Sequence, residues 1–191
     1  YTKVIEQEPT GDFGPHALYG LGWTLYRTGE YQDCTRVMSK LIRDFGRTEK
    51  IARKGYYVRA MAAYQLDELA DVLSDIDRYL QTQPALNDEL DAMYVKGLAL
   101  NGSERPQQAV KVFEAIIARG SEYESGDKVM YELGWTYKDL GQPAQAVRAF
   151  DQLASTCPDS AMAAESLFLV GESWYDAEDF DKDAAAYARS S

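Results

Sequence analysis

The residue types that usually carry catalysis are scarce in this sequence. His16 is the only histidine, and Cys34 and Cys157 are the only cysteines among 191 residues. One histidine excludes catalytic schemes that need two, and two distant thiols form neither a disulfide framework nor a zinc site. A Gly-x-Ser-x-Gly elbow, a phosphate-binding glycine loop and a His-Glu-x-x-His motif are also absent from the sequence. We therefore expect no enzyme activity, no metal and no cofactor.

Composition and charge narrow the classes of partner. Hydrophobic residues make up 46% of the chain, which is enough for a folded core. Lys and Arg number 20 against 31 for Asp and Glu, so the formal charge is −11. A binder of nucleic acid needs cationic contacts to phosphates, so nucleic acid is not an expected partner. Apolar runs stay far below the roughly 20 residues of a membrane span, and we expect no transmembrane segment in this chain.

A repeat of 37 or 38 residues runs through the sequence. Small residues recur in steps of 38, 37, 37 and 37 at Gly22, Ala60, Gly97, Gly134 and Gly171. A mid-repeat column of turn formers follows the same steps: Gly29, Asp67, Glu104, Gly141 and Glu178. A period of this length is typical of helical repeat arrays, in which each unit stacks on its neighbours.

Each unit reads as two helices joined by a short turn, and the fourth unit shows this most clearly. Pro143 fits the first turn of a second helix, and Pro158 ends that helix. Apolar residues on both sides of the turn follow the helical spacing of three and four. A glycine within a helix costs about 1 kcal/mol relative to alanine, so Gly134 needs a packing reason. We expect Gly134 to face Ala146, where two helices approach closely.

These features resemble the tetratricopeptide repeat (TPR) family. The fourth unit carries the family pattern as Leu133-Gly134-x-x-Tyr137, then Ala146-x-x-x-Phe150, then Pro158. The resemblance implies an all-α fold, a right-handed superhelical solenoid of antiparallel helix hairpins. Units that exceed the usual 34 residues, with Gly-Trp in the first helix, are similar to bacterial cell-envelope members. These include outer-membrane assembly lipoproteins and the Tol-Pal accessory protein, so the resemblance favours the bacterial periplasm or cell envelope.

The register divides the chain into units of a single array. Residues 1–9 match the second helix of a preceding unit. Five units are then expected at 15–46, 53–84, 90–121, 127–158 and 164–191, the last of them truncated. The chain is therefore interpreted as part of a longer array.

The resemblance also implies a binding surface, because first helices line the concave face of a TPR superhelix. Reading that face off the register gives an aromatic-rich row, which suits an extended chain or a partner helix. The expected groove residues are Tyr19, Trp23, Tyr26, Tyr57, Met61, Tyr64, Tyr94, Leu98, Asn101, Tyr131, Trp135, Lys138, Phe168 and Tyr175.

Two interpretations of this row stay open. The aromatic side chains either form a groove or pack as ordinary core between neighbouring repeats. As a groove, the row predicts a protein-interaction scaffold that binds a protein or peptide partner. The alternative function is a regulatory or enzyme-associated helical-repeat domain that senses a peptide or a small molecule.

Overall fold

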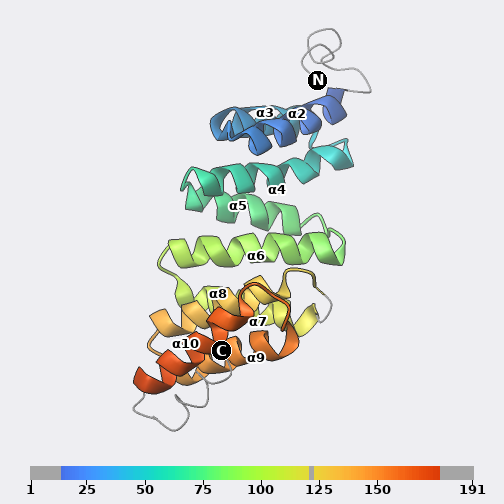
Figure 1. Ribbon diagram of the computed structural model, residues 1–191. Helices are drawn as coiled ribbons and strands as arrows, with labels where there is room; N and C mark the ends of the chain where they lie inside the picture. The colour runs from blue at the N-terminus through green and yellow to red at the C-terminus, as the bar shows by residue number, and fades with distance from the viewer. Residues whose placement is uncertain (1–13, 121–122, 177–191) are drawn as a thin grey trace. The chain divides into compact units, whose positions relative to one another are not determined.

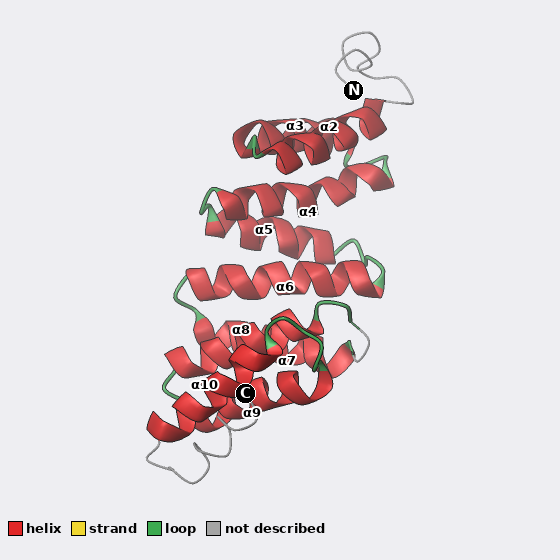
Figure 2. Cartoon of the chain, in the orientation of Figure 1, coloured by secondary structure: helices red, strands yellow, loops and turns green. Residues whose placement is uncertain are grey.

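Helices are the only regular secondary structure in the described part of the chain. The computed structural model describes residues 14–120 and 123–176, apart from the side chains at 173, 175 and 176. Within those residues there are nine helices and no strand, which confirms the all-α fold (Figures 1 and 2). The expectations for residues 1–9, for the turn at Glu178 and for the second helix of the last unit lie outside the described residues.

The chain divides into two compact units, Tyr1–Ala99 and Leu100–Ser191. The N-terminal unit holds α2 (Gly14–Thr28), α3 (Tyr31–Phe45), α4 (Lys50–Gln65) and α5 (Leu69–Leu80). The division falls within α6 (Leu86–Gly102). The C-terminal unit holds α7 (Pro106–Arg119), α8 (Gly126–Asp139), α9 (Pro143–Thr156) and α10 (Ala163–Asp176).

The mid-repeat turns share one backbone conformation. Gly29 and Gly141 have φ values of 82° and 66°, and Asp67 and Glu104 have φ values of 60° and 56°. These four residues are the described members of the turn column found in the sequence. The left-handed region costs a glycine nothing but costs other residues about 1–2 kcal/mol. Two of the four turns therefore form despite local strain, because helix packing on both sides determines their geometry.

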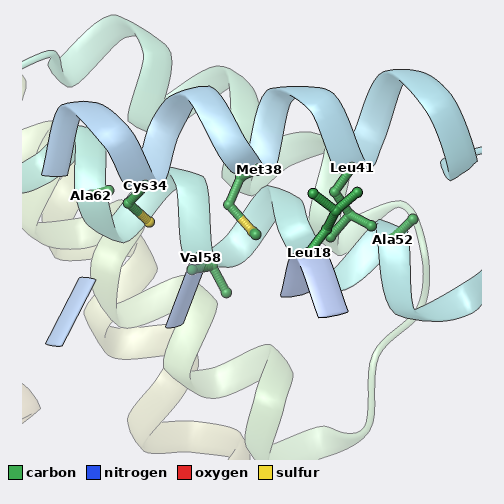
Figure 3. Close-up of a cluster of buried hydrophobic side chains, with 7 residues drawn as sticks. All are labelled: Leu18, Cys34, Met38, Leu41, Ala52, Val58 and Ala62. Atoms are coloured by element: carbon green, nitrogen blue, oxygen red, sulfur yellow. The ribbon is translucent and has the colours of Figure 1, made fainter. Parts of the chain in front are cut away.

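Apolar faces of successive helices form the core of each unit. In the N-terminal unit, Leu18 of α2 packs with Met38 of α3 and Val58 of α4 (Figure 3). In the C-terminal unit, Phe150 of α9 is fully buried and belongs to a cluster with Leu169 and Val170 of α10. Since helices α2 to α5 and α7 to α10 contact their neighbours in chain order, each unit is a stack of hairpins.

The small-residue column is buried between helices, as expected from the cost of a helical glycine. All five column residues are buried. The partner expected for Gly134 was wrong, however: the nearest side chain is Phe150 rather than Ala146. Gly22 likewise faces Met38. Met38 has the same position in the first repeat as Phe150 has in the fourth. Gly22 and Gly134 therefore each make room for a large side chain one turn further along the second helix.

Candidate functional site

The first helix of the N-terminal unit carries a row of three aromatic side chains in contact with one another. On α2, Tyr19 and Trp23 meet edge to face with ring centroids 6.4 Å apart, and Trp23 meets Tyr26 in the same way at 5.8 Å. All three side chains are half-buried and pack against the core cluster beneath them. Each ring thus packs against the core and also keeps part of its surface accessible. The side chains therefore have features of both an inter-repeat core and a groove.

A pocket of about 240 Å³ lies beside this stack. Tyr57 of α4 and Tyr79 of α5 contribute two further rings to it, with centroids 5.5 Å apart. We call this pocket the N-terminal groove and define it by its lining residues: Tyr19, Trp23, Lys54, Tyr57, Tyr79, Asp88 and Asp91. Three of the expected groove residues therefore meet in one cavity.

The described lining of the N-terminal groove includes one ammonium group and two carboxylates. Lys54 of α4 pairs with Asp88 of α6 at 3.6 Å between Nζ and Oδ2, and Asp91 adds a second carboxylate. Burial raises the pKa of Tyr57, with the charge of Asp91 as the next cause. Burial also raises the pKa of Tyr79 to about 12, with Asp88 as the next cause. Both phenols therefore stay protonated at neutral pH.

The aromatic side chains on α8 of the C-terminal unit make more contacts with other side chains of the same protein. Tyr131 and Trp135 of α8 pack edge to face on the buried Phe150, with ring centroids 6.0 and 6.2 Å away. Lys138 lies over the Trp135 ring at 5.1 Å and pairs with Glu172 of α10 at 3.3 Å. This tryptophan is thus already covered by a cation from its own helix.

The other expected groove residues differ in environment. Asn101 donates a hydrogen bond from Nδ2 to Thr136 Oγ1 at 2.7 Å, so its amide joins α6 to α8. Phe168 is an exposed large hydrophobic residue, with 47% of its surface accessible. The side chain of Tyr175 lies outside those that the structure describes. The remaining four are half-buried: Met61, Tyr64, Tyr94 and Leu98.

Sequence reasoning missed four lining residues of the N-terminal groove: Lys54, Tyr79, Asp88 and Asp91. Tyr79 belongs to a second helix, and the expected row contained only first-helix positions. A signal for two of the others was present in the register. Lys54 and Asp91 occupy the same repeat position, three residues before the tyrosine column, with opposite charges on successive first helices.

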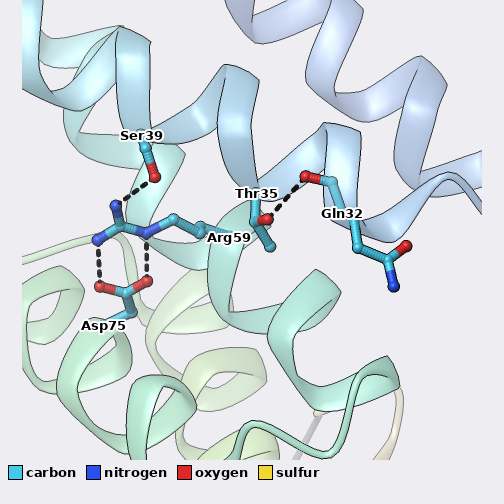
Figure 4. A network of polar contacts seen from close by, with 5 residues as sticks. All are labelled: Gln32, Thr35, Ser39, Arg59 and Asp75. Atoms are coloured by element: carbon cyan, nitrogen blue, oxygen red, sulfur yellow. Dashed lines mark hydrogen bonds and ion pairs between the residues drawn. The ribbon is translucent and has the colours of Figure 1, made fainter.

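A second polar feature lies where three helices of the N-terminal unit meet. Arg59 of α4 donates two hydrogen bonds to Asp75 of α5, at 2.6 and 2.7 Å, and a third to Ser39 of α3 at 2.8 Å (Figure 4). Asp75 is only 4% exposed. The hydrogen bond to Asp75 is the main reason that the pKa of Arg59 is raised. A charged pair thus ties three helices together beside a separate pocket of about 360 Å³.

The sequence matches one known protein family over most of its length. The sequence profile of a family described as YfiO, outer membrane lipoprotein, matches residues 12–171. The chain belongs to the YfiO outer membrane lipoprotein family. No curated protein matches this YfiO-family chain. Among its described residues, none of the helices has the length and apolar character needed to cross a membrane.

Solved structures resemble the YfiO-family chain in fold. The TPR protein YrrB, described as having an unusual peptide-binding site, aligns with a TM-score of 0.74 at 14% identity, over 99% of this chain and 89% of its own. MamA from Desulfovibrio magneticus has a TM-score of 0.76 at 19% identity, over 94% of both chains. TPR-like repeats of a putative kinesin light chain from Podosopora anserina have a TM-score of 0.69 at 14% identity, over 91% and 95%. These likenesses confirm the TPR solenoid fold.

Proposed function

We propose that this chain is a protein-interaction scaffold of the bacterial cell envelope that acts without catalysis of its own. Membership of an outer membrane lipoprotein family supports the compartment, and the TPR fold supports the scaffold role. The partner is a protein or peptide segment that lies along the aromatic side chains of the first helices.

The observation that carries the proposal is the N-terminal groove. Its four rings come from α2, α4 and α5, so the hairpin stack itself holds them in place. Tyr19, Trp23 and Tyr57 are half-buried and pack against the core on one side. Rigid aromatic rings that retain exposure are the anchors on which protein interfaces most often depend.

Trp23→Ala in the full-length protein tests the proposal. We expect partners recovered by affinity purification to bind more weakly by about 2 kcal/mol, as central aromatic anchors predict. The loss in unfolding free energy should be smaller. Trp174→Ala is the matched control, because Trp174 packs against the C-terminal core and is not part of the N-terminal groove.

The opposite ordering would contradict the proposal. An unfolding loss of about 3 kcal/mol, the usual range for truncating a buried tryptophan, with binding unchanged after correction for the folded fraction would make Trp23 a core residue.

A further inference from the structure

A positively charged pocket lies in the N-terminal unit, where the first turn of α4 meets the loop between α5 and α6. It holds about 320 Å³, within the range of about 300–1,000 Å³ that is usual for small-ligand sites. We call it the basic pocket, after its charged lining residues: Lys50, Arg53, Lys54 and Asp88. Three cations against one carboxylate contrast with the formal charge of −11 on the whole chain.

Contacts within the chain neutralise only one of the three cations. Lys54 pairs with Asp88 at 3.6 Å between Nζ and Oδ2. Neither Lys50 nor Arg53 has an ion-pair partner among the described residues. Arg53 donates a hydrogen bond from Nε to the carbonyl oxygen of Gly46 at 3.4 Å, which orients the guanidinium group. The two terminal nitrogens of Arg53 are left for a bidentate contact with an anion.

Helix α4 also begins with the opposite charge to that which helices prefer. The N-terminus of a helix favours acidic side chains, because its amide groups carry partial positive charge. Acidic residues occupy the first turn of α3, α5, α6, α8 and α10. The first turn of α4 instead contains Lys50 and Arg53 and no acidic residue. Helix stability therefore does not explain these two cations, and an anion between them would offset the repulsion.

The uncompensated charge of the basic pocket matches a phosphate group with two negative charges. Lys50 and Arg53 supply two positive charges that the Lys54–Asp88 pair does not cancel. A phosphate monoester carries about −1.5 to −2 at pH 7, whereas a carboxylate or a phosphodiester carries a single charge. Arginine binds phosphate oxygens through two parallel N–H groups, and lysine binds them as a point charge.

We propose that the basic pocket binds a phosphate monoester or inorganic phosphate through Lys50 and Arg53. The basic pocket shares Lys54, Tyr79 and Asp88 with the N-terminal groove, but Lys50 and Arg53 do not line that groove. The inference therefore goes beyond the proposed function and does not depend on it. The phosphate belongs to a soluble molecule or to a lipid headgroup, and the experiment separates these two sources.

Calorimetry with methyl phosphate and dimethyl phosphate tests the inference on the whole chain. The two probes are similar in size, but at neutral pH methyl phosphate carries close to two charges and dimethyl phosphate carries one. At constant ionic strength, we expect methyl phosphate to bind about tenfold more tightly, because the second charge meets an uncompensated cation.

Variants locate the effect. Lys50→Gln combined with Arg53→Gln should weaken the binding of methyl phosphate by about tenfold or more, because both uncompensated cations are removed. Arg43→Gln combined with Arg47→Gln is the matched control. It removes the same charge from exposed positions just before α4 that do not line the pocket, and affinity should stay within about twofold. Circular dichroism melting checks the fold, and Lys50→Gln alone, at an exposed position, serves if its double variant is unstable.

Flotation with phosphatidylcholine vesicles, with and without phosphatidic acid, identifies the source of the phosphate. Binding that requires phosphatidic acid and is lost in the Lys50→Gln, Arg53→Gln variant supports the pocket and assigns it to a lipid headgroup. Binding of methyl phosphate without such flotation supports the pocket and assigns it to a soluble phosphate.

Three results would overturn the inference. The first is that neither methyl phosphate nor the phosphatidic acid vesicles bind. The second is equal binding of methyl and dimethyl phosphate. The third is that the Lys50→Gln, Arg53→Gln variant binds like the wild type or like the Arg43→Gln, Arg47→Gln control, since binding would then not depend on the lining of the pocket.

Discussion

At the residue scale, the packing of Gly134 against Phe150 shows how one missing side chain organises a hairpin. A methyl group added at Gly134 would collide with the ring of Phe150. That ring also supports Tyr131 and Trp135 from below. The glycine therefore controls the position of the aromatic side chains in the C-terminal unit as well as the helix spacing.

Gly134→Leu should therefore destabilise the protein by several kcal/mol, at or above the upper end of the roughly 1–3 kcal/mol usual for overpacking, because the buried ring cannot move aside. Urea unfolding measures the loss. Gly126→Ala in the same helix is the control, since nothing lies within 4 Å of a methyl group added there. Equal midpoints for Gly134→Leu and the wild type would show that this contact is not tight.

The environment of a single residue was predictable from the sequence only where the same residue type recurs at one repeat position. Burial of the glycine column followed from recurrence at one register position. The identity of its partner did not, because the stagger of a hairpin places Phe150, not Ala146, opposite Gly134. The carboxylates of the N-terminal groove were missed for a similar reason. Both reach a pocket whose tryptophan belongs to α2. Asp91 shares the repeat position of Lys54, but no spacing along the chain links Asp88 to that pocket.

At the scale of elements, the left-handed turns between paired helices set the hairpin geometry. Glu104 adopts a φ of 56°, which strains a residue with a side chain. Glu104→Gly should raise the free energy of unfolding by about 0.5–1 kcal/mol, since relief of that strain exceeds the added entropy of glycine in the unfolded chain. Gly141→Ala should lower it by about 1 kcal/mol, because it introduces the same strain.

Urea unfolding of the two turn variants gives the comparison directly. The informative result is the opposite sign of the two changes. If Glu104→Gly destabilised the protein, the interactions of the Glu104 side chain would stabilise the fold by more than its backbone strain costs. Backbone conformation alone would then not explain the residue at this turn.

The Arg59–Asp75 pair joins neighbouring helices of the N-terminal unit. Asp75→Asn leaves the guanidinium without its charged partner at a largely buried point, so we expect a loss of about 3 kcal/mol in unfolding free energy. Asp33→Asn breaks the exposed pair with Arg36 on α3 and should cost about 0.5 kcal/mol or less.

A double replacement distinguishes a buried charge from lost packing. Arg59→Met combined with Asp75→Leu should recover most of the stability in urea unfolding, because apolar residues of similar volume need no charged partner. A double variant no more stable than Asp75→Asn would show that the helices depend on the ion pair itself.

Element order was more predictable than element contacts. The repeat predicted paired helices, and the position of Pro143 at the start of α9 followed from its missing amide donor. The three-helix junction at Arg59 was not predictable, because residues 39, 59 and 75 have no common register. It forms because α3 and α5 both contact α4.

At the scale of the whole molecule, the same repeat serves two purposes. Apolar columns stack the hairpins into the core of each unit, and the first-helix aromatic side chains pack on that core while keeping part of their surface accessible. In the C-terminal unit, Lys138 covers Trp135, whereas the N-terminal unit has a tyrosine at that position. The units therefore share a fold but differ in whether a lysine covers the tryptophan at this repeat position.

The central claim is that the aromatic side of the first helices, rather than the second helices, contacts the partner. Site-specific photo-crosslinking of the full-length protein in its native cells tests this most directly. p-Benzoylphenylalanine replaces Phe168, an exposed residue of α10, the first helix of the fifth repeat, or Arg148, an exposed residue of α9, the second helix of the fourth repeat. We predict a discrete protein adduct from position 168 and none from position 148. An adduct from position 148, with none from position 168, would contradict the claim and place the binding surface on the second helices.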